Sequence, residues 1–216
     1  MTHTVRYLLT FAATLNIAGC ASSFLPKPID PPAIFTLTSS AQRSLSQFPT
    51  TAINPSITRL GTVNATLIIS APHANGGLNS THMLYVPRVN ELAYFAQSQW
   101  VDSPSAMLMP LIAQAIQSTG VFKAVLSTPT GALAQFRLDT DLIRLEQSFL
   151  VKPSQVQFAL RTVIIDTFTR KVIAQRDFSA SVAAQTEDAY GGVVAAQEAV
   201  QKVLTEMAIF CSEAVR

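Results

Sequence analysis

The sequence predicts an α+β fold, a two-layer sandwich in which a mostly antiparallel sheet carries two amphipathic helices on one face. Three observations predict it. Residues 104–119 and 189–213 each place apolar side chains along one stripe at helical spacing. Several other segments alternate apolar and polar side chains, as half-buried strands do. A helix with one apolar stripe must bury it against another layer, so we expect the strands to form a sheet that covers both helices.

The N-terminal segment is typical of an exported bacterial lipoprotein. Arg6 precedes an apolar run over residues 7–17, which is about 11 residues long and well short of the roughly 20 that span a bilayer. Two small residues then precede Cys20, an order that resembles a lipobox. Residues 1–19 are therefore predicted to be a signal peptide, after whose removal Cys20 carries lipid on its sulfur. The alternative is an ordinary signal peptide with a cysteine at its end by chance.

Acyl chains on Cys20 would determine where the protein works. One chain holds a protein to a membrane only marginally, whereas two or three attach it permanently, since each buried CH₂ adds ~0.8 kcal/mol. The residues after Cys20 include no early Asp, the inner-membrane signal of enteric-type lipoproteins, so the resemblance implies the outer membrane, facing the periplasm. Residues 20–32 contain four prolines and are predicted to be an extended tether that reaches roughly 35 Å at ~3.1 Å per residue.

The strands are predicted from short alternating segments that end at turn residues. In chain order they are residues 33–38, 61–70, 82–87, 91–96, 121–126, 133–149, 155–165 and 171–182. We expect the third to pair with the fourth, and the last two with each other, as hairpins. Residues 39–58 show no periodicity and are predicted to be a loop. Nothing divides residues 33–216, which we expect to form a single domain.

The strand over residues 133–149 changes the phase of its apolar positions. Alternate side chains from Phe136 to Leu142 are apolar or Thr, while Arg137, Asp139 and Asp141 occupy the opposite face. Beyond Leu142 the apolar positions shift by one residue. The shift predicts a bulge or bend, because the faces of a strand alternate with a period of two.

The first helix has clear end signals. Asp102 or Ser103 can cap it, and Pro104 suits the first helical position. Gly120 is placed to end it. Pro110 lies inside and removes one helical hydrogen bond, so we expect a kink or a later regular start.

The second helix is predicted to begin after Asp188, which can cap its N-terminus. Its apolar stripe is expected to contain Tyr190, Val193, Val194, Gln197, Val200, Val203, Leu204, Met207 and Cys211. With Cys20 lipidated, Cys211 has no partner within the chain. We interpret Cys211 as a small buried hydrophobic residue, the alternative being an intermolecular bridge or a reactive thiol.

The composition argues against a nucleic-acid partner. The chain holds 15 Lys+Arg and 13 Asp+Glu, a net charge of +2, and shows no basic stripe. Charged residues make up 13% of the chain, against about 25% in typical domains. Such a surface favours protein contacts or assembly into a homo-oligomer, although uncharged periplasmic surfaces without partners also occur.

The chain offers no convincing set of catalytic or metal-binding residues. His73 and His82 are the histidines that follow the signal segment, and a zinc site needs further ligands. Asp139, Asp141 and Glu146 could be drawn as acid–base groups, but solvated charge on the outer face of a strand explains them better. We predict that the protein is not an enzyme and uses no cofactor or metal.

Two further groups allow more than one interpretation. Gly191 and Gly192 at a helix start could bind an anion, although close packing against the sheet is the favoured reason for them. Tyr85, Tyr94 and Trp100 could form an aromatic contact patch, or could pack in the core or at its rim.

The chain resembles a known family in the order and spacing of its motifs. These are Met83–Tyr85, Asn90–Phe95, Trp100–Pro104, Met107–Leu108, Leu111, Gly120–Phe122, Leu138–Asp139, Leu145–Glu146 and Tyr190–Val193. Together they resemble the ABC-type transport auxiliary lipoproteins, whose better-known members are the paraquat-inducible (Pqi) auxiliary lipoproteins. The stretch from Tyr85 to Phe122 is the most specific part of the resemblance.

The resemblance implies a role beside an MCE-type lipid transporter. In such systems an inner-membrane ABC transporter and an MCE-domain protein move phospholipid or other lipid across the envelope, and the auxiliary lipoprotein sits at the outer membrane and receives or anchors the assembly. The family has no known catalytic residues, so none are carried over. We expect the exposed part of the region that contains Tyr85, Tyr94 and Trp100 to contact the partner. The alternative is a scaffold or activator lipoprotein for cell-wall or polysaccharide machinery, since fold alone does not separate these roles.

Overall fold

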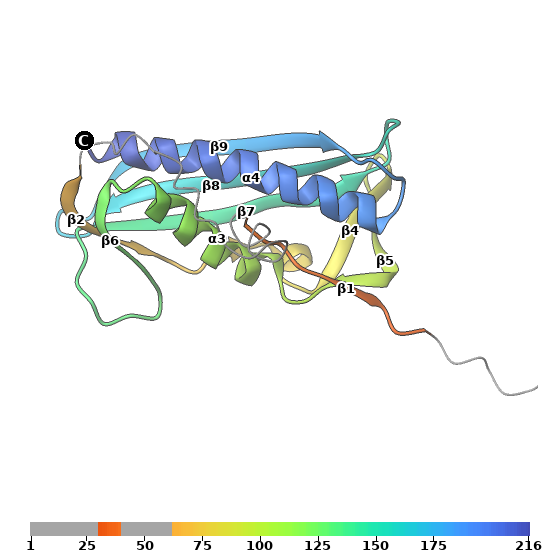
Figure 1. Cartoon of the computed structure of the whole chain (residues 1–216), viewed down its shortest axis with the longest axis horizontal. Coiled ribbons are helices and arrows are strands. Elements are labelled where there is room, and N and C mark those ends of the chain that lie inside the picture. The colour runs from red at the N-terminus through yellow and green to blue at the C-terminus, as the bar shows by residue number, and fades with distance from the viewer. Residues whose placement is uncertain (1–29, 40–61) are drawn as a thin grey trace, which may run out of the picture. The chain divides into compact units, whose positions relative to one another are not determined.

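The structure, a computed structural model, describes residues 30–39 and 62–216. The chain divides into two compact units, Met1–Pro31 and Pro32–Arg216. Almost all of the first unit lies outside the described residues. So do the predicted signal peptide, Cys20, most of the tether and most of the predicted loop over residues 39–58. The second unit contains the sheet and both helices (Figure 1).

The sheet has nine strands in the described residues. They are β1 Ala33–Phe35, β2 Val63–Ile69, β3 His73–Ala74, β4 His82–Arg88, β5 Glu91–Trp100, β6 Phe122–Ser127, β7 Phe136–Ser148, β8 Gln155–Asp166 and β9 Lys171–Ala183. A short 3₁₀ helix, η1, covers Gly76–Leu78. Every predicted strand is present, with ends that differ by a few residues. The short β3 was not predicted, because two residues carry no periodic signal.

The longest strands form an antiparallel meander of β7, β8 and β9. The hairpin between β8 and β9 is the predicted one. The ladder between β7 and β8 shifts register between Leu142 and Arg144, which confirms the bulge inferred from the change of apolar phase.

The other edge of β7 is shared by three strands in succession. β2 pairs with its start at Phe136–Leu138, β3 with Asp141–Leu142, and β4 with its end at Gln147–Ser148. These three pairings are parallel, as are those of β2 with β6 and of β1 with β5. The α+β class is confirmed, and the sheet is mixed: its longest ladders are antiparallel, and the short parallel ones were not foreseen. Alternation of side chains reports which face is buried but carries no information on strand direction.

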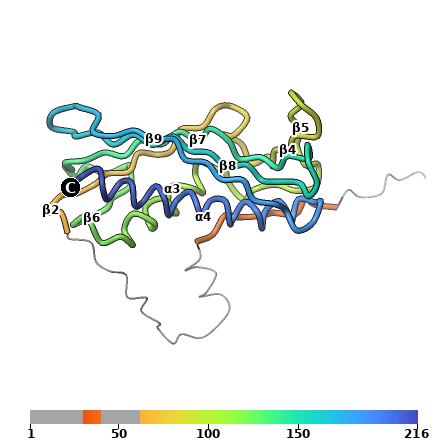
Figure 2. Tube along the Cα trace, turned by 90° about the horizontal axis from the view of Figure 1, so that it is seen from above, coloured from red at the N-terminus to blue at the C-terminus, as the bar shows by residue number. Residues whose placement is uncertain are grey.

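Both helices pack on the same side of the sheet (Figure 2). Helix α3 spans Pro104–Ser118 and α4 spans Ala189–Ala214. The Ser103 hydroxyl accepts a hydrogen bond from the Ala106 amide at 3.4 Å, and Gly120 ends α3 with φ of +66°. Because α3 begins at Pro104, the later start that Pro110 suggested is not observed. Neither of the helices described here is both long and apolar enough to cross a bilayer.

The core lies between the sheet and the helices. The apolar residues with at most 1% of their surface exposed are Leu67, Ile69, Leu108, Ile112, Ile116, Val121, Leu138, Leu142, Phe158, Leu160, Ile164, Ala199, Val203, Met207 and Cys211. Burying each large apolar side chain contributes about 1.5–3 kcal/mol. Cys211 is therefore the buried hydrophobic residue of the first interpretation, and burial raises the pKa of its thiol to about 12.

The stripe predicted for α4 is wrong at its N-terminal end. Tyr190 and Val194 are 63% and 38% exposed, whereas Ala195, Ala196 and Ala199 are buried there. The start of α4 approaches the sheet too closely for large side chains, so small residues occupy the inner face.

The face of the sheet away from the helices carries the charge that the alternation predicted. Arg161 and Asp177 pair across β8 and β9 with two hydrogen bonds of 2.8 Å, and Arg137 bonds Asp139 at 2.9 Å on β7. These side chains are about half exposed, so they form a solvated polar face.

Candidate functional site

The three aromatic residues predicted to meet a partner do not share a surface. Tyr85 is half-buried in a cluster with Phe95 and Phe149, at ring-centroid distances of 4.7 and 5.7 Å. It lies opposite Ala93 in the β4–β5 ladder, on the same face as Phe95. Tyr94 follows on the other face, where it is 49% exposed and its ring lies 4.8 Å from that of His82.

Trp100 is part of the core, with 4% of its surface exposed. Simple alternation would place it on the same face as Tyr94. The β4–β5 ladder, however, steps from His82 opposite Gln99 to Leu84 opposite Tyr94, so β5 holds three residues more than β4 in this interval. An odd number of extra residues reverses the faces, and Trp100 turns inward. Tyr94 is therefore the exposed member of the predicted trio.

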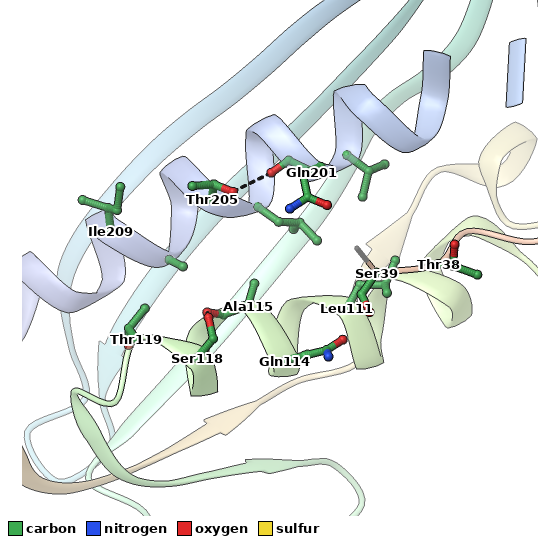
Figure 3. A pocket seen from close by; sticks show the side chains of 13 residues that line it. Thr38, Ser39, Leu111, Gln114, Ala115, Ser118, Thr119, Gln201, Thr205 and Ile209 are labelled. Carbon is green, nitrogen blue, oxygen red and sulfur yellow. Dashed lines mark hydrogen bonds between the residues drawn. The ribbon is translucent and has the colours of Figure 1, made fainter. Parts of the chain in front are cut away.

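A pocket with a volume of about 320 Å³ lies between α3 and α4, and we call it the groove (Figure 3). Its apolar wall consists of Leu111, Ala115, Val200, Leu204, Ala208 and Ile209. Hydroxyl and amide side chains supply the rest: Thr38, Ser39, Gln114, Ser118, Thr119, Gln201 and Thr205. None of these thirteen side chains is charged, so the pocket suits apolar contact and offers no acid, base or metal ligand.

The groove exists because small residues occupy its sides. Ala115 faces it from α3, and Ala208 lines it from α4, where larger side chains would close the gap between the helices. The sequence analysis missed this pocket. Each alanine lies beside the apolar stripe of its own helix. The sequence does not show which sides of the two helices face each other, so it does not show the space between them.

The end of β1 is held beside this groove by Gln197 of α4. The Gln197 amide nitrogen donates to the Thr36 carbonyl oxygen at 2.9 Å, and its amide oxygen accepts from the Thr38 backbone nitrogen at 3.0 Å. The Gln197 side chain thus satisfies backbone groups of this segment that a neighbouring strand would otherwise bind. This explains why a polar residue lies on the predicted apolar stripe.

Gly191 and Gly192 mark a close contact. A Cβ atom at Gly191 would collide with the backbone of Thr186, and one at Gly192 with the side-chain oxygen of Gln147 on β7. The Gly191 amide already donates to the Asp188 carboxylate at 2.8 Å. Close packing therefore explains the pair, and the amide that an anion would need is occupied.

Residues capable of metal or catalytic chemistry lie apart. Across residues 30–39 and 62–216, no three His, Cys, Asp or Glu side chains come together. The imidazole of His73 lies 3.6 Å from the Asp141 carboxylate, and both side chains are more than half exposed. Cys211 is enclosed in the core.

Comparison with solved structures shows the same fold elsewhere. A crystal structure of a protein from Xanthomonas campestris matches with a TM-score of 0.70 at 18% sequence identity, covering 85% of this chain and 96% of that one. A second, of an uncharacterized protein, matches with a TM-score of 0.61 at 12% identity, covering 87% and 100%. At such identities the likeness concerns the fold alone.

Comparison with sequences is more specific. No curated protein matches the chain. The family described as the ABC-type transport auxiliary lipoprotein component matches residues 44–208, which include β2 to β9, α3 and most of α4. Because this match covers well over half of the sequence, the chain belongs to the family of ABC-type transport auxiliary lipoprotein components.

Proposed function

We propose that the protein is a lipid-anchored component of an ABC transport system that moves lipid through the bacterial envelope, and that it acts by docking to other proteins. The observation that carries the proposal is the family match, since it covers all but one strand of the sheet and most of the helix layer. The uncharged groove between α3 and α4 supports docking, because acid–base catalysis needs titratable groups at the place where substrate binds.

The proposed anchor is lipid on Cys20, which holds the protein at the inner leaflet of the outer membrane, facing the periplasm. Replacing Cys20 with Ala in cells is expected to remove labelling by a palmitate analogue and to release the protein from the envelope fraction. Retention of a non-acylated protein in that fraction would contradict this part of the proposal.

The proposed partner is the MCE-domain protein of the same transport system, together with its ABC transporter. Tyr94 is the member of the predicted contact region best placed to touch it, because nearly half of the side chain is exposed on the face opposite the Tyr85 cluster. Trp100 is excluded from direct contact by its burial.

Crosslinking in cells followed by mass spectrometry tests the partner. The proposal expects recovery of the MCE protein, and fewer crosslinks after Tyr94→Ala. Tyr190→Ala is the matched control, since that tyrosine is also exposed but lies at the start of α4. Recovery of cell-wall or polysaccharide synthases without an MCE protein would favour the scaffold function instead. The mass of the purified complex would show whether copies of the chain assemble.

A further inference from the structure

Two turns at one end of the sheet form an exposed apolar surface, which we call the N-side tip. It consists of Val89 in the β4–β5 turn, Leu92 at the start of β5, and Leu150 and Val151 in the β7–β8 turn, with exposed fractions of 73%, 62%, 49% and 50%. All four are large apolar side chains, and nothing in the described part of the chain covers them.

The two turns are held side by side. Val86 pairs with Ser148 at the end of the β4–β7 ladder, and the Phe149 amide donates to the Val86 carbonyl at 2.9 Å. Tyr85 packs edge-on against Phe149 beneath them. The apolar side chains are therefore carried by one rigid base.

Two cations accompany this surface. Arg88 is highly exposed and pairs with Glu91 at 2.7 Å across the β4–β5 turn, and exposed Lys152 follows Val151. Glu91 offsets the charge of Arg88, which leaves Lys152 as the net positive charge beside these apolar side chains. An apolar surface with a net positive charge suits the boundary between the headgroups and acyl chains of an anionic bilayer.

The direction of β1 indicates which end of the sheet faces the bilayer to which the chain is anchored. β5 begins at the N-side tip, and β1 runs parallel to it, with Ala33 opposite Ser98. Within the unit Pro32–Arg216, β1 therefore runs away from the tip, and Ala33 is its residue nearest to the tip (Figure 1). The eight residues of β5 from Glu91 to Ser98 span roughly 23 Å. The tether predicted from the sequence between Cys20 and the domain, roughly 35 Å, is longer than this distance.

We propose that the N-side tip rests in the interfacial layer of the bilayer that holds the lipid on Cys20, with Val89 and Val151 inserted between headgroups. This inference rests on the proposed lipid anchor. It orients the domain, since the opposite end of β7 and β8 then faces away from the membrane and toward a partner.

The opposite end supplies a matched control. Leu133 and Phe168 are 88% and 70% exposed there, and the Thr167 amide joins their two turns by donating to the Gln135 carbonyl at 2.9 Å. We call these two residues the C-side tip. Exposed Arg170 and Lys171 follow Phe168, so apolar and basic side chains occur together at both tips. The two tips are distinguished by the direction in which β1 runs.

The test uses the acylated protein in vesicles of phosphatidylethanolamine and phosphatidylglycerol. Val89→Cys and, separately, Phe168→Cys carry an environment-sensitive fluorophore on the new thiol, while buried Cys211 stays unlabelled. The probe at position 89 is expected to shift its emission to the blue and to be quenched by spin-labelled lipids. The probe at position 168 is expected to do neither. Adding Val151→Asp to the first variant should abolish the shift, and adding Leu133→Asp should not.

Each other outcome overturns the inference. A shift at position 168 alone would mean the reverse orientation, and no shift at either position would mean that the domain stands off the bilayer. A shift at position 89 only after the transport partner is added would make the tip a protein contact. Co-flotation of the unlabelled protein with vesicles reports the anchor separately, so its loss would contradict the proposed function and not merely the orientation. Emission from Trp100, the single tryptophan, verifies that each variant is folded.

Discussion

Two threonine hydroxyls face each other beneath the helices. Thr140 of β7 lies directly opposite Thr162 of β8, and they are 3% and 0% exposed. In the part of the chain that the structure describes, neither hydroxyl oxygen has a hydrogen-bond partner. A buried hydroxyl without a partner costs about 1–3 kcal/mol relative to one in water. These two residues therefore weaken the core of the sheet.

Replacing both threonines with Val should raise the free energy of unfolding by about 1–3 kcal/mol, because valine has a similar shape and leaves no polar group to desolvate. Urea unfolding followed by Trp100 emission measures the change. Thr205→Val is the control, since the Thr205 hydroxyl donates to the Gln201 carbonyl at 2.8 Å and is exposed. A double variant no more stable than the natural chain would show that the hydroxyls are satisfied.

Asp188 couples the start of α4 to pH. Its carboxylate accepts hydrogen bonds from the Gly191 amide at 2.8 Å and from the Thr186 hydroxyl at 2.7 Å. The Gly191 bond is the main cause that lowers the pKa of Asp188 below its ordinary value, and the Thr186 bond adds to it. Because the pKa of Asp188 is lower in the folded protein, its ionised carboxylate stabilises the fold at pH values above the pKa of Asp188 in the unfolded chain. This stabilisation is lost as the pH falls through the pKa of Asp188 in the folded protein.

Asp188→Asn should flatten this dependence, because asparagine also caps a helix but does not titrate. The natural chain is expected to lose stability relative to the variant as pH falls below about 4, the usual range for Asp. Urea midpoints of both proteins between neutral and acid pH test this. Parallel profiles would show that the carboxylate charge contributes nothing at this cap.

At the scale of elements, α3 combines good ends with a weak interior. Ser103 caps it, Pro104 occupies its first position and Gly120 ends it, each at the place its chemistry suits. Pro110 lies in the middle and is exposed, so its ring adds no core packing while removing the amide that would donate to Ala106.

Pro110→Ala is therefore expected to raise the free energy of unfolding by about 2 kcal/mol, the restored helical bond being partly offset by the greater freedom of the unfolded chain. Chemical unfolding followed by circular dichroism measures this. Pro104→Ala should bring no such gain, since an amide at the first position has no helical partner and the Pro104 ring is buried. Equal effects of both substitutions would mean that the position of proline in α3 is unimportant.

At the scale of the molecule, a single core joins the two ends of the sheet. Trp100 lies in that core at the end of β5 away from the N-side tip, and Cys211 lies in it near the end of α4. Both belong to the unit Pro32–Arg216, and its apolar cluster draws on β2, β4, β5, β6, β7, β8, β9 and both helices.

Denaturation should therefore expose both residues together. With Cys20 acylated, Cys211 is the remaining thiol of the chain, and its raised pKa keeps it unreactive while the protein is folded. Trp100 emission, thiol labelling and far-ultraviolet circular dichroism are expected to share one midpoint. A lower midpoint for Trp100 would identify the β4–β5 end as a separately unfolding part.

Much of this arrangement could be predicted where the cause is local. Ser103, Asp188 and Gly120 act within one helical turn, and the phase change after Leu142 is visible along a single strand. Trp100 shows the limit. Its burial follows from extra residues in β5 relative to β4, and that count exists only once the two strands are paired.

The chain's periodicity, caps and turns alone determined its α+β class, both helices and the hairpins β4–β5 and β8–β9, and the order of its motifs indicated the family. Tertiary structure decided the parallel ladders along β7, the groove between α3 and α4, the inward turn of Trp100 and the pairing of two apolar turns at the N-side tip. The physical reason is the distance along the sequence over which each effect acts. Backbone preference and side-chain alternation act over a few neighbouring residues, whereas strand direction, register and helix contact depend on which distant surfaces bury each other.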